Sequence, residues 1–240
     1  MVFLILEKCV IQDKMINIVP AILEKSLKEF EEKLSLVWGN VSRVQVDIID
    51  GKFAEIITIG PEDLGQIDTV VAFDAHLMVE KPEEWIKRCV AGGVDRVFGQ
   101  VEKMEDKVAF IGDAQAEGLM VGLAYDIDTP LDGLEEYIND LDAVLLMAVK
   151  AGEQGREFDE RVLEKIKAVR KLSKTVDIVV DGGLNVENIK RCIAAEWAEE
   201  IEEDELNRSV ALLDFAVGSY LFGAENVKEE LLRLQQLEEH

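Results

Sequence analysis

Short runs of apolar and β-branched residues alternate along this chain with longer amphipathic stretches, and this alternation limits the possible folds more than any other feature. It predicts βα units arranged around a parallel sheet. The eight predicted strands are Asn17–Pro20, Arg43–Ile48, Val70–His76, Arg96–Gln100, Met120–Ala124, Ala143–Met147, Asp177–Val180 and Leu212–Val217. The predicted helices are Leu27–Leu36, Pro82–Val90, Lys103–Glu117, Leu131–Asn139, Glu160–Leu172, Val186–Glu203 and Asn226–Leu237, with the least helical segment after the second strand.

The length of these units favours a closed barrel. Eight units of about 28 residues fill the chain from residue 15 onward, close to what one strand, one helix and two short loops need. We therefore predict an α/β fold of the (β/α)8 barrel type, with a doubly wound sheet as the alternative. Pro82 and Pro130, each followed by acidic residues, mark two expected helix starts. Since no linker rich in Pro, Gly or Ser divides the chain, we expect one barrel domain over residues 15–240 after an N-terminal extension over residues 1–14.

The net charge of the chain limits the kinds of partner that it can bind. The formal net charge is −24 at pH 7, and such a field repels nucleic acid and anionic membrane surfaces. The early apolar run Val2–Leu6 is too short for a secretory signal or a bilayer span. We expect no nucleic-acid or membrane partner. The acidic segment Glu196–Leu206 is interpreted as an exposed helix face.

The few cysteines and histidines limit the kinds of metal site and catalytic pair that the chain can form. Cys9, Cys89 and Cys192 cannot all pair and are not spaced as CxxC, which argues against a disulfide scaffold or a thiolate zinc site and favours a cytoplasmic location. The two histidines are His76 and the last residue, His240. A Ser-His or Cys-His catalytic pair would therefore have to use His76.

Polar residues stand near the ends of three predicted strands. Gln45 and Asp47 share one face of the second strand by side-chain alternation, and His76 closes the third. Asp181 directly follows the seventh strand. Barrel active sites form at the carboxyl ends of the strands, so we predict that Asp47, His76 and Asp181 meet there.

Each of these residues also has a simpler interpretation. Asp50-Gly51 is an ordinary turn sequence. One buried histidine is commonly a hydrogen-bonded core residue. The sequence Asp181-Gly182-Gly183 is compatible with a plain strand-to-helix turn in which Asn185 caps the next helix. The combination of three strand ends is what favours catalysis.

Glycine-rich turns late in the chain predict a phosphate site. They are Gly152–Gly155, Gly182-Gly183 and Gly218-Ser219, which follow the sixth, seventh and eighth strands. Backbone N–H groups at such turns bind phosphate without basic side chains. An acidic protein can hold an anion in this way.

Several stretches resemble the ribulose-phosphate 3-epimerases in order and spacing, over roughly Ile16 to Phe222. They are VQVDIIDGKFAEIITIGPEDL, FDAHLMVEKPEEWI, LDAVLLMAVKAGEQGREF, IVVDGGLNVENI and FAVGSYLF. The resemblance implies a TIM barrel of the ribulose-phosphate-binding type. It further implies inversion at C3 of a ketopentose phosphate, with Asp47 and Asp181 exchanging protons on opposite faces of that carbon.

The resemblance also implies a metal. In the family, two His and two Asp hold a divalent ion such as zinc, iron or manganese. This chain keeps Asp47, His76 and Asp181 but has Gln45 at the place of the first His. Gln45 thus remains only a candidate ligand, and we expect weaker metal binding because a neutral amide oxygen is a poorer ligand than imidazole.

Other expectations from the resemblance concern the substrate. The residues implied to contact the sugar or its phosphate are His76, Met78, Met147, Gly152, Gly155, Gly182, Gly183, Gly218 and Ser219. The chain departs from the family pattern at Ala21, Ile49, Gln100, Lys150, Gln154 and Arg156. We hypothesise that the cations Lys150 and Arg156 compensate for the altered phosphate loop.

Three functional interpretations stay open. The first is an epimerase for D-ribulose 5-phosphate. The second is an enzyme that acts on another ketose phosphate, and the third is a sugar-phosphate-binding protein without turnover. The resemblance also suggests a homo-oligomer.

Overall fold

The computed structural model describes residues 16–152, 155–197 and 211–239. Eight parallel strands form a closed barrel in which each strand pairs with its sequence neighbours and the last pairs with the first. The predicted (β/α)8 barrel is confirmed. The strands are β1 (Ile16–Ile22), β2 (Arg43–Ile49), β3 (Ala72–Met78), β4 (Arg96–Gln100), β5 (Met120–Tyr125), β6 (Ala143–Met147), β7 (Asp177–Asp181) and β8 (Leu213–Val217).

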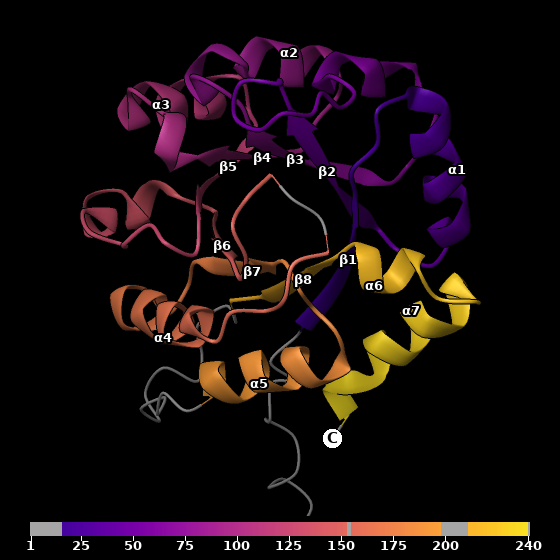
Figure 1. Cartoon of the computed structure of the whole chain (residues 1–240). Coiled ribbons are helices and arrows are strands. Elements are labelled where there is room, and N and C mark those ends of the chain that lie inside the picture. The colour runs from indigo at the N-terminus through magenta and orange to yellow at the C-terminus, as the bar shows by residue number, and fades with distance from the viewer. Residues whose placement is uncertain (1–15, 153–154, 198–210, 240) are drawn as a thin grey trace, which may run out of the picture.

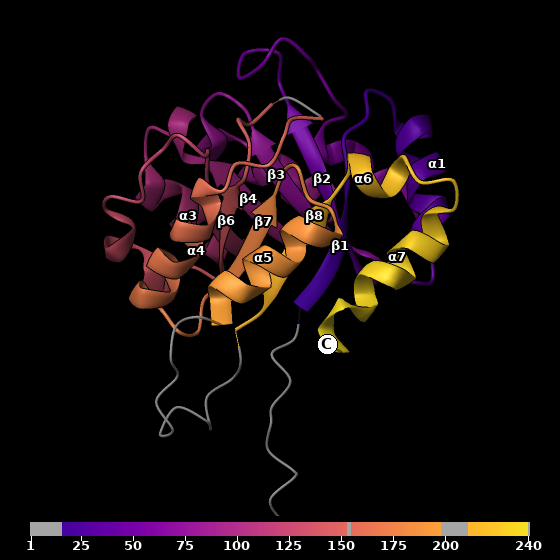
Figure 2. The same ribbon diagram turned by 60° about the horizontal axis from the view of Figure 1, so that its bottom comes forward.

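Helices surround the barrel (Figure 1). The α-helices are α1 (Leu27–Val37), α2 (Ile86–Ala91), α3 (Lys107–Ala116), α4 (Arg161–Leu172), α5 (Val186–Trp197), α6 (Ser219–Phe222) and α7 (Val227–Gln235). Short 3-10 segments are η1 (Pro61–Gln66), η2 (Pro82–Glu84), η3 (Val101–Lys103), η4 (Leu134–Glu136), η5 (Ile138–Asp140) and η7 (Gln236–Glu239). Figure 2 shows α4, α5 and α7 on the outside of the strands.

Local sequence signals explain where the helices begin. The Ser26 side chain accepts a hydrogen bond from the backbone N–H of Glu29 at the start of α1. The Asn185 side chain accepts one from the backbone N–H of Asn188 at the start of α5. Each side chain satisfies a donor that the first helical turn leaves without a partner. The capping role expected for Asn185 is therefore present.

Two apolar clusters form the core, because strand residues alternate between two faces. Side chains such as Val46 and Val144 face outward and pack with helix residues such as Phe30 and Ile166. A second cluster, with Phe98 at its centre, fills the barrel interior. This alternation leaves the polar residues of the strands inside the barrel, at its two ends.

Two predictions about helices need correction. The predicted helix Leu131–Asn139 is wrong, since this segment forms only the 3-10 turns η4 and η5. Gly133 has a φ of 80°, outside the helical region, and it interrupts the pattern just after Pro130. Pro82 begins the 3-10 segment η2 rather than an α-helix, and α2 starts four residues later.

The structure tests the predictions about the N-terminal extension, the acidic segment and membrane spans only in part. The expected extension, residues 1–14, lies outside the described residues, as does most of the expected acidic helix face, residues 198–206. At Glu196 the exposed interpretation is wrong, because this side chain is buried in an ion pair with Arg170. Among the described helices, none has both the length and the apolar character needed to cross a bilayer.

Candidate active site

The carboxyl end of the barrel interior brings together five polar side chains from four strands. Gln45 and Asp47 come from β2, His76 from β3, Gln100 from β4 and Asp181 from β7. Asp47 and His76 are partners in the register of β2 and β3. The side chains of Gln45, His76 and Gln100 are completely buried. The predicted meeting of Asp47, His76 and Asp181 is thus observed.

The three predicted residues lie within reach of one bound ion. One potential ligand atom from each of Asp47, His76 and Asp181 lies within 4.8 Å of the others. The His76 Nδ1 atom is 3.3 Å from Asp47 Oδ1 and 3.6 Å from Asp181 Oδ2. The Gln45 Nε2 group donates to Asp47 Oδ1 at 2.9 Å and to Asp181 Oδ2 at 2.6 Å. An imidazole and an amide therefore bridge two carboxylates.

The electrostatics of the cluster favour a positive charge at its centre. Burial by itself lowers the pKa of His76, but the Asp181 and Asp47 carboxylates outweigh it and raise that pKa to about 10. Burial, together with repulsion from Asp181, raises the pKa of Asp47. A protonated His76 thus balances part of the negative charge. A cation that binds here must displace this proton.

Gln100 orients His76, and the sequence did not reveal this contact. The His76 Nε2 atom lies 2.9 Å from Gln100 Oε1, to which a protonated Nε2 donates. This bond leaves Nδ1 as the ring atom that faces the carboxylates. A hydrogen bond of this kind fixes the tautomer and orientation of a metal-binding imidazole. Gln100 is the last residue of β4 and shares its inner face with Arg96. This alternation in the sequence could have predicted that Gln100 points into the barrel.

The side chains present fit a divalent cation. Asp47, His76 and Asp181 provide two carboxylates and one imidazole nitrogen, a donor set that suits first-row divalent metals. The Gln45 Oε1 atom is buried and receives no hydrogen bond from any described residue. The nitrogen end of this amide, and not the oxygen, faces the two carboxylates.

A cavity beside the carboxylates is lined by the late glycine turns. The predicted residues around it are Asp47, Met78, Met147, Gly152, Gly155, Asp181, Gly182, Gly183, Gly218 and Ser219. His76 is buried and is not among the residues that line this cavity, while its Nδ1 atom lies near Asp47 and Asp181; its contact with substrate stays a prediction. Arg156 also lines the cavity. Lys150 is exposed and lies outside the described lining, so of the two cations only Arg156 is placed at this cavity, and their role toward a phosphate stays a hypothesis.

The turn after β7 depends on glycine. Gly182 and Gly183 have φ values of 104° and 61°, which side-chain-bearing residues rarely adopt. A Cβ atom at Gly183 would lie 2.6 Å from the backbone nitrogen of Phe158. The close approach of these two segments shapes the cavity next to Asp181.

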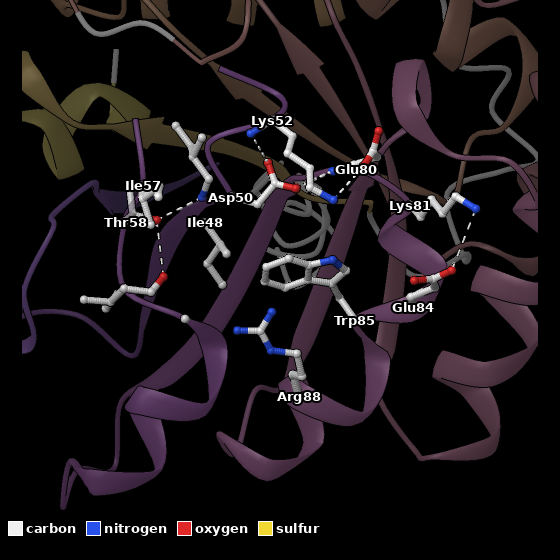
Figure 3. Close-up of a pocket in the computed structure, with 13 residues that line it drawn as sticks. Ile48, Asp50, Lys52, Ile57, Thr58, Glu80, Lys81, Glu84, Trp85 and Arg88 are labelled. Atoms are coloured by element: carbon white, nitrogen blue, oxygen red, sulfur yellow. Dashed lines mark hydrogen bonds and ion pairs between the residues drawn. The ribbon is translucent and has the colours of Figure 1, made fainter. Parts of the chain in front are cut away.

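A second and larger cavity, of about 550 Å³, lies between the loop after β2 and the η2–α2 segment (Figure 3). Its basic side chains already have acidic partners. The pairs are Lys52 with Glu80 at 2.8 Å, Lys81 with Glu105 at 3.1 Å, and Arg88 with Glu62 at 2.7 Å. The Arg88 guanidinium also stacks on Trp85. We assign the chemistry to the barrel mouth instead.

Comparison with known proteins identifies the family of the chain. Residues 17–200 match the model of the Ribulose-phosphate 3 epimerase family. The chain belongs to this family. Ribulose-phosphate 3-epimerase of Bacillus subtilis is 32% identical over 189 residues, which cover 75% of this chain and 87% of the relative. The enzyme of Mycobacterium tuberculosis strain H37Rv is 28% identical over 215 residues, 87% of each chain.

Solved structures support the same fold. Orotidine 5'-monophosphate decarboxylase from Methanocaldococcus jannaschii has a TM-score of 0.65 at 15% identity and covers 94% of this chain and 100% of its own. Phosphoribosyl anthranilate isomerase from Thermotoga maritima has a TM-score of 0.59 at 18% identity, with 94% and 99% covered. Family membership confirms the predicted enzyme class, an isomerase of the epimerase type.

Proposed function

We propose that this protein interconverts D-ribulose 5-phosphate and D-xylulose 5-phosphate by moving a proton at C3. The observation that carries the proposal is the pair Asp47 and Asp181, which line one cavity from strands β2 and β7 and both lie near His76 Nδ1. A proton next to a ketone is weakly acidic, so its removal needs a nearby base and a stabilised enediolate. Two carboxylates allow removal on one face and return on the other.

The remaining residues have roles that follow from their positions. One carboxylate accepts the C3 proton while the other, protonated, donates to the opposite face. The raised pKa of Asp47 suits a group that must exist in both forms. The backbone of the turns at Gly182, Gly183 and Gly218 would hold the phosphate, while Met78 and Met147 would enclose the carbon chain.

Asp47, His76 and Asp181 would hold the divalent metal proposed for this site, which is zinc, iron or manganese. A bound cation polarises the substrate oxygens and stabilises negative charge on the enediolate. His76, held by Gln100, orients the two carboxylates through its Nδ1 atom.

The altered cavity wall favours one alternative. Ala21 lines the cavity where the resemblance places a Ser, so one hydroxyl contact to the sugar is absent at that position. A ketose phosphate other than ribulose 5-phosphate is the second candidate substrate. If the protein catalyses no proton exchange at all, a sugar-phosphate-binding role without turnover becomes the favoured interpretation.

The test is proton NMR of D-ribulose 5-phosphate in deuterium oxide with the purified protein, with chelator in one sample and manganese in another. We expect loss of the C3 proton signal together with the appearance of D-xylulose 5-phosphate. Absence of exchange in every sample would overturn the proposal. A parallel series with six-carbon ketose phosphates then identifies a different substrate.

Two further points are proposals of the same kind. A reducing, cytoplasmic location is consistent with the buried free thiols of Cys89 and Cys192. A homo-oligomer is proposed from the family resemblance, and sedimentation velocity tests it.

A further inference from the structure

Gln45 occupies an unusual position in the site. Its side chain is completely buried on the inner face of β2, two residues before Asp47. Its Nε2 group donates to Asp47 Oδ1 at 2.9 Å and to Asp181 Oδ2 at 2.6 Å. The nitrogen end of the amide therefore faces the point where the two carboxylates and His76 converge.

The oxygen end of the same amide lacks a partner. Gln45 Oε1 is buried, and no described residue donates a hydrogen bond to it. A buried acceptor without a donor costs free energy, because it has lost its hydrogen bonds to water. The two ends of a glutamine amide have nearly the same size and shape. Half a turn about the last side-chain bond would break the two hydrogen bonds from Nε2 but none at the oxygen end, so a cation that binds the oxygen has only the first two to replace.

The charge at the centre of the site decides which end of the amide faces it. When Oε1 points toward Asp47 and Asp181, three negative or partly negative oxygen groups converge, which is unfavourable without a cation. A divalent cation reverses this preference, because it attracts all three oxygens and repels the amide N–H groups. Both orientations are therefore accessible, and the cation selects between them.

We propose that the Gln45 amide reverses when a divalent cation enters the site, so that Oε1 becomes a ligand beside Asp47, His76 and Asp181. This inference rests on the metal site described under the proposed function. The resulting donor set has three oxygens and one imidazole nitrogen. Oxygen-rich sets favour harder ions such as Mn²⁺ more than sets with a second imidazole do. Gln45 then lowers the preference of the site for Zn²⁺ over Mn²⁺.

The test measures metal affinity without substrate, by calorimetry with Mn²⁺ and, separately, with Zn²⁺. Gln45→Met keeps the length of the side chain but removes the oxygen, and we expect it to weaken Mn²⁺ binding about tenfold or more. Gln45→His should increase the ratio of Zn²⁺ to Mn²⁺ affinity by about tenfold or more. Gln115→Met, a matched change on the outer helix α3, should leave both affinities unchanged.

A second measurement follows the amide itself. With side-chain ¹⁵N-labelled glutamine, the Gln45 NH₂ signals, identified by their loss in Gln45→Glu, should move when Zn²⁺ saturates the site. Gln45→Glu keeps an oxygen ligand and adds a charge, so it should bind Mn²⁺ more tightly than the wild type even if Gln45→Met does not fold.

Wild-type Mn²⁺ affinity in a folded Gln45→Met variant, or unmoved NH₂ signals at metal saturation, would overturn the inference. Failure of the proposed function shows itself differently. It would appear as absent C3 proton exchange in a protein whose metal binding still depends on Gln45.

Discussion

The two ends of the barrel interior both carry polar side chains from β2, β3 and β4, yet the negative charges at the two ends are balanced by different groups. At the amino end, Arg96 Nη2 donates to Asp74 Oδ2 at 2.6 Å and to Asp214 Oδ2 at 3.0 Å. Arg43 pairs with the other oxygen of Asp74. The Asn17 amide donates to Asp214 at 2.9 Å. These carboxylates face guanidinium groups whose charge cannot be lost, so their negative charge is balanced by side chains, although the buried Arg96 Nε has no hydrogen-bond partner among the described residues.

At the carboxyl end, two carboxylates share one imidazole and one amide. Asp47 and Asp181 both contact His76 and Gln45, and Gln45 Oε1 receives no hydrogen bond from the described part of the chain. At the amino end, permanent guanidinium charges balance the buried carboxylates and support the fold. At the carboxyl end, one imidazole and one neutral amide face two carboxylates, which leaves room for a cation and a reacting sugar.

A matched pair of substitutions on one strand should distinguish the roles of the two ends with the largest effect. Asp181→Asn removes a proposed proton-transfer group at the carboxyl end and should lower kcat about 10³-fold. Asp177→Asn changes the same residue type four positions earlier, at the amino end, and should keep kcat within about twofold of the wild type. Steady-state epimerisation assays check both. Equal losses in the two variants would contradict the division of roles.

A substitution at the amino end of the barrel tests whether that end stabilises the fold. Asp74→Asn removes a carboxylate between Arg43 and Arg96, and should lower the free energy of unfolding by about 3 kcal/mol, because buried guanidinium charge loses its partner. Urea unfolding followed by circular dichroism measures it. Glu62→Gln, in the exposed pair with Arg88, should cost less than about 1 kcal/mol. Similar losses in both variants would mean that burial of the ion pair is irrelevant.

The glycine turn at the carboxyl end gives a smaller effect on substrate binding. Gly183→Ala introduces a Cβ atom against Phe158 at a left-handed φ, and should raise KM about tenfold by displacing the proposed phosphate turn. Gly118→Ala has a similar φ of 79° but open space around it. It therefore carries only the backbone strain and should leave KM unchanged. A KM effect shared by both would point to general destabilisation.

The smallest expected effect concerns the cations near the phosphate turns. Arg156→Ala should raise KM by up to about fivefold, since an exposed ionic contact contributes no more than about 1 kcal/mol. Lys150→Ala should have no effect, because Lys150 lies outside the described cavity lining. The two variants are compared with saturating and subsaturating sugar phosphate. An equal increase for Lys150→Ala would support the hypothesis that both cations serve the phosphate loop.

Much of the fold and part of the site could be predicted from the sequence. The apolar alternation placed β4 and β6 at their observed bounds, because a closed parallel barrel imposes the same inward and outward pattern on every strand. The same alternation put Gln45 and Asp47 on one face. Local rules failed where one residue decided the outcome, as Gly133 did for the predicted helix Leu131–Asn139.

Contacts across the barrel could not be predicted. The bond from Gln45 to Asp181 joins residues 136 positions apart, and the bond from His76 to Gln100 joins neighbouring strands. Both depend on the register between strands, which the pattern of a single strand does not specify.

The measurement that tests the central claim most directly follows the C3 proton of each epimer in deuterium oxide, with Asp47→Asn and Asp181→Asn compared side by side. Two bases on opposite faces predict that neither variant interconverts the epimers at the wild-type rate. They also predict that each variant exchanges the proton of a different epimer. Wild-type interconversion by either variant, or exchange of the same epimer by both, would contradict the assignment of Asp47 and Asp181 as the two proton-transfer groups.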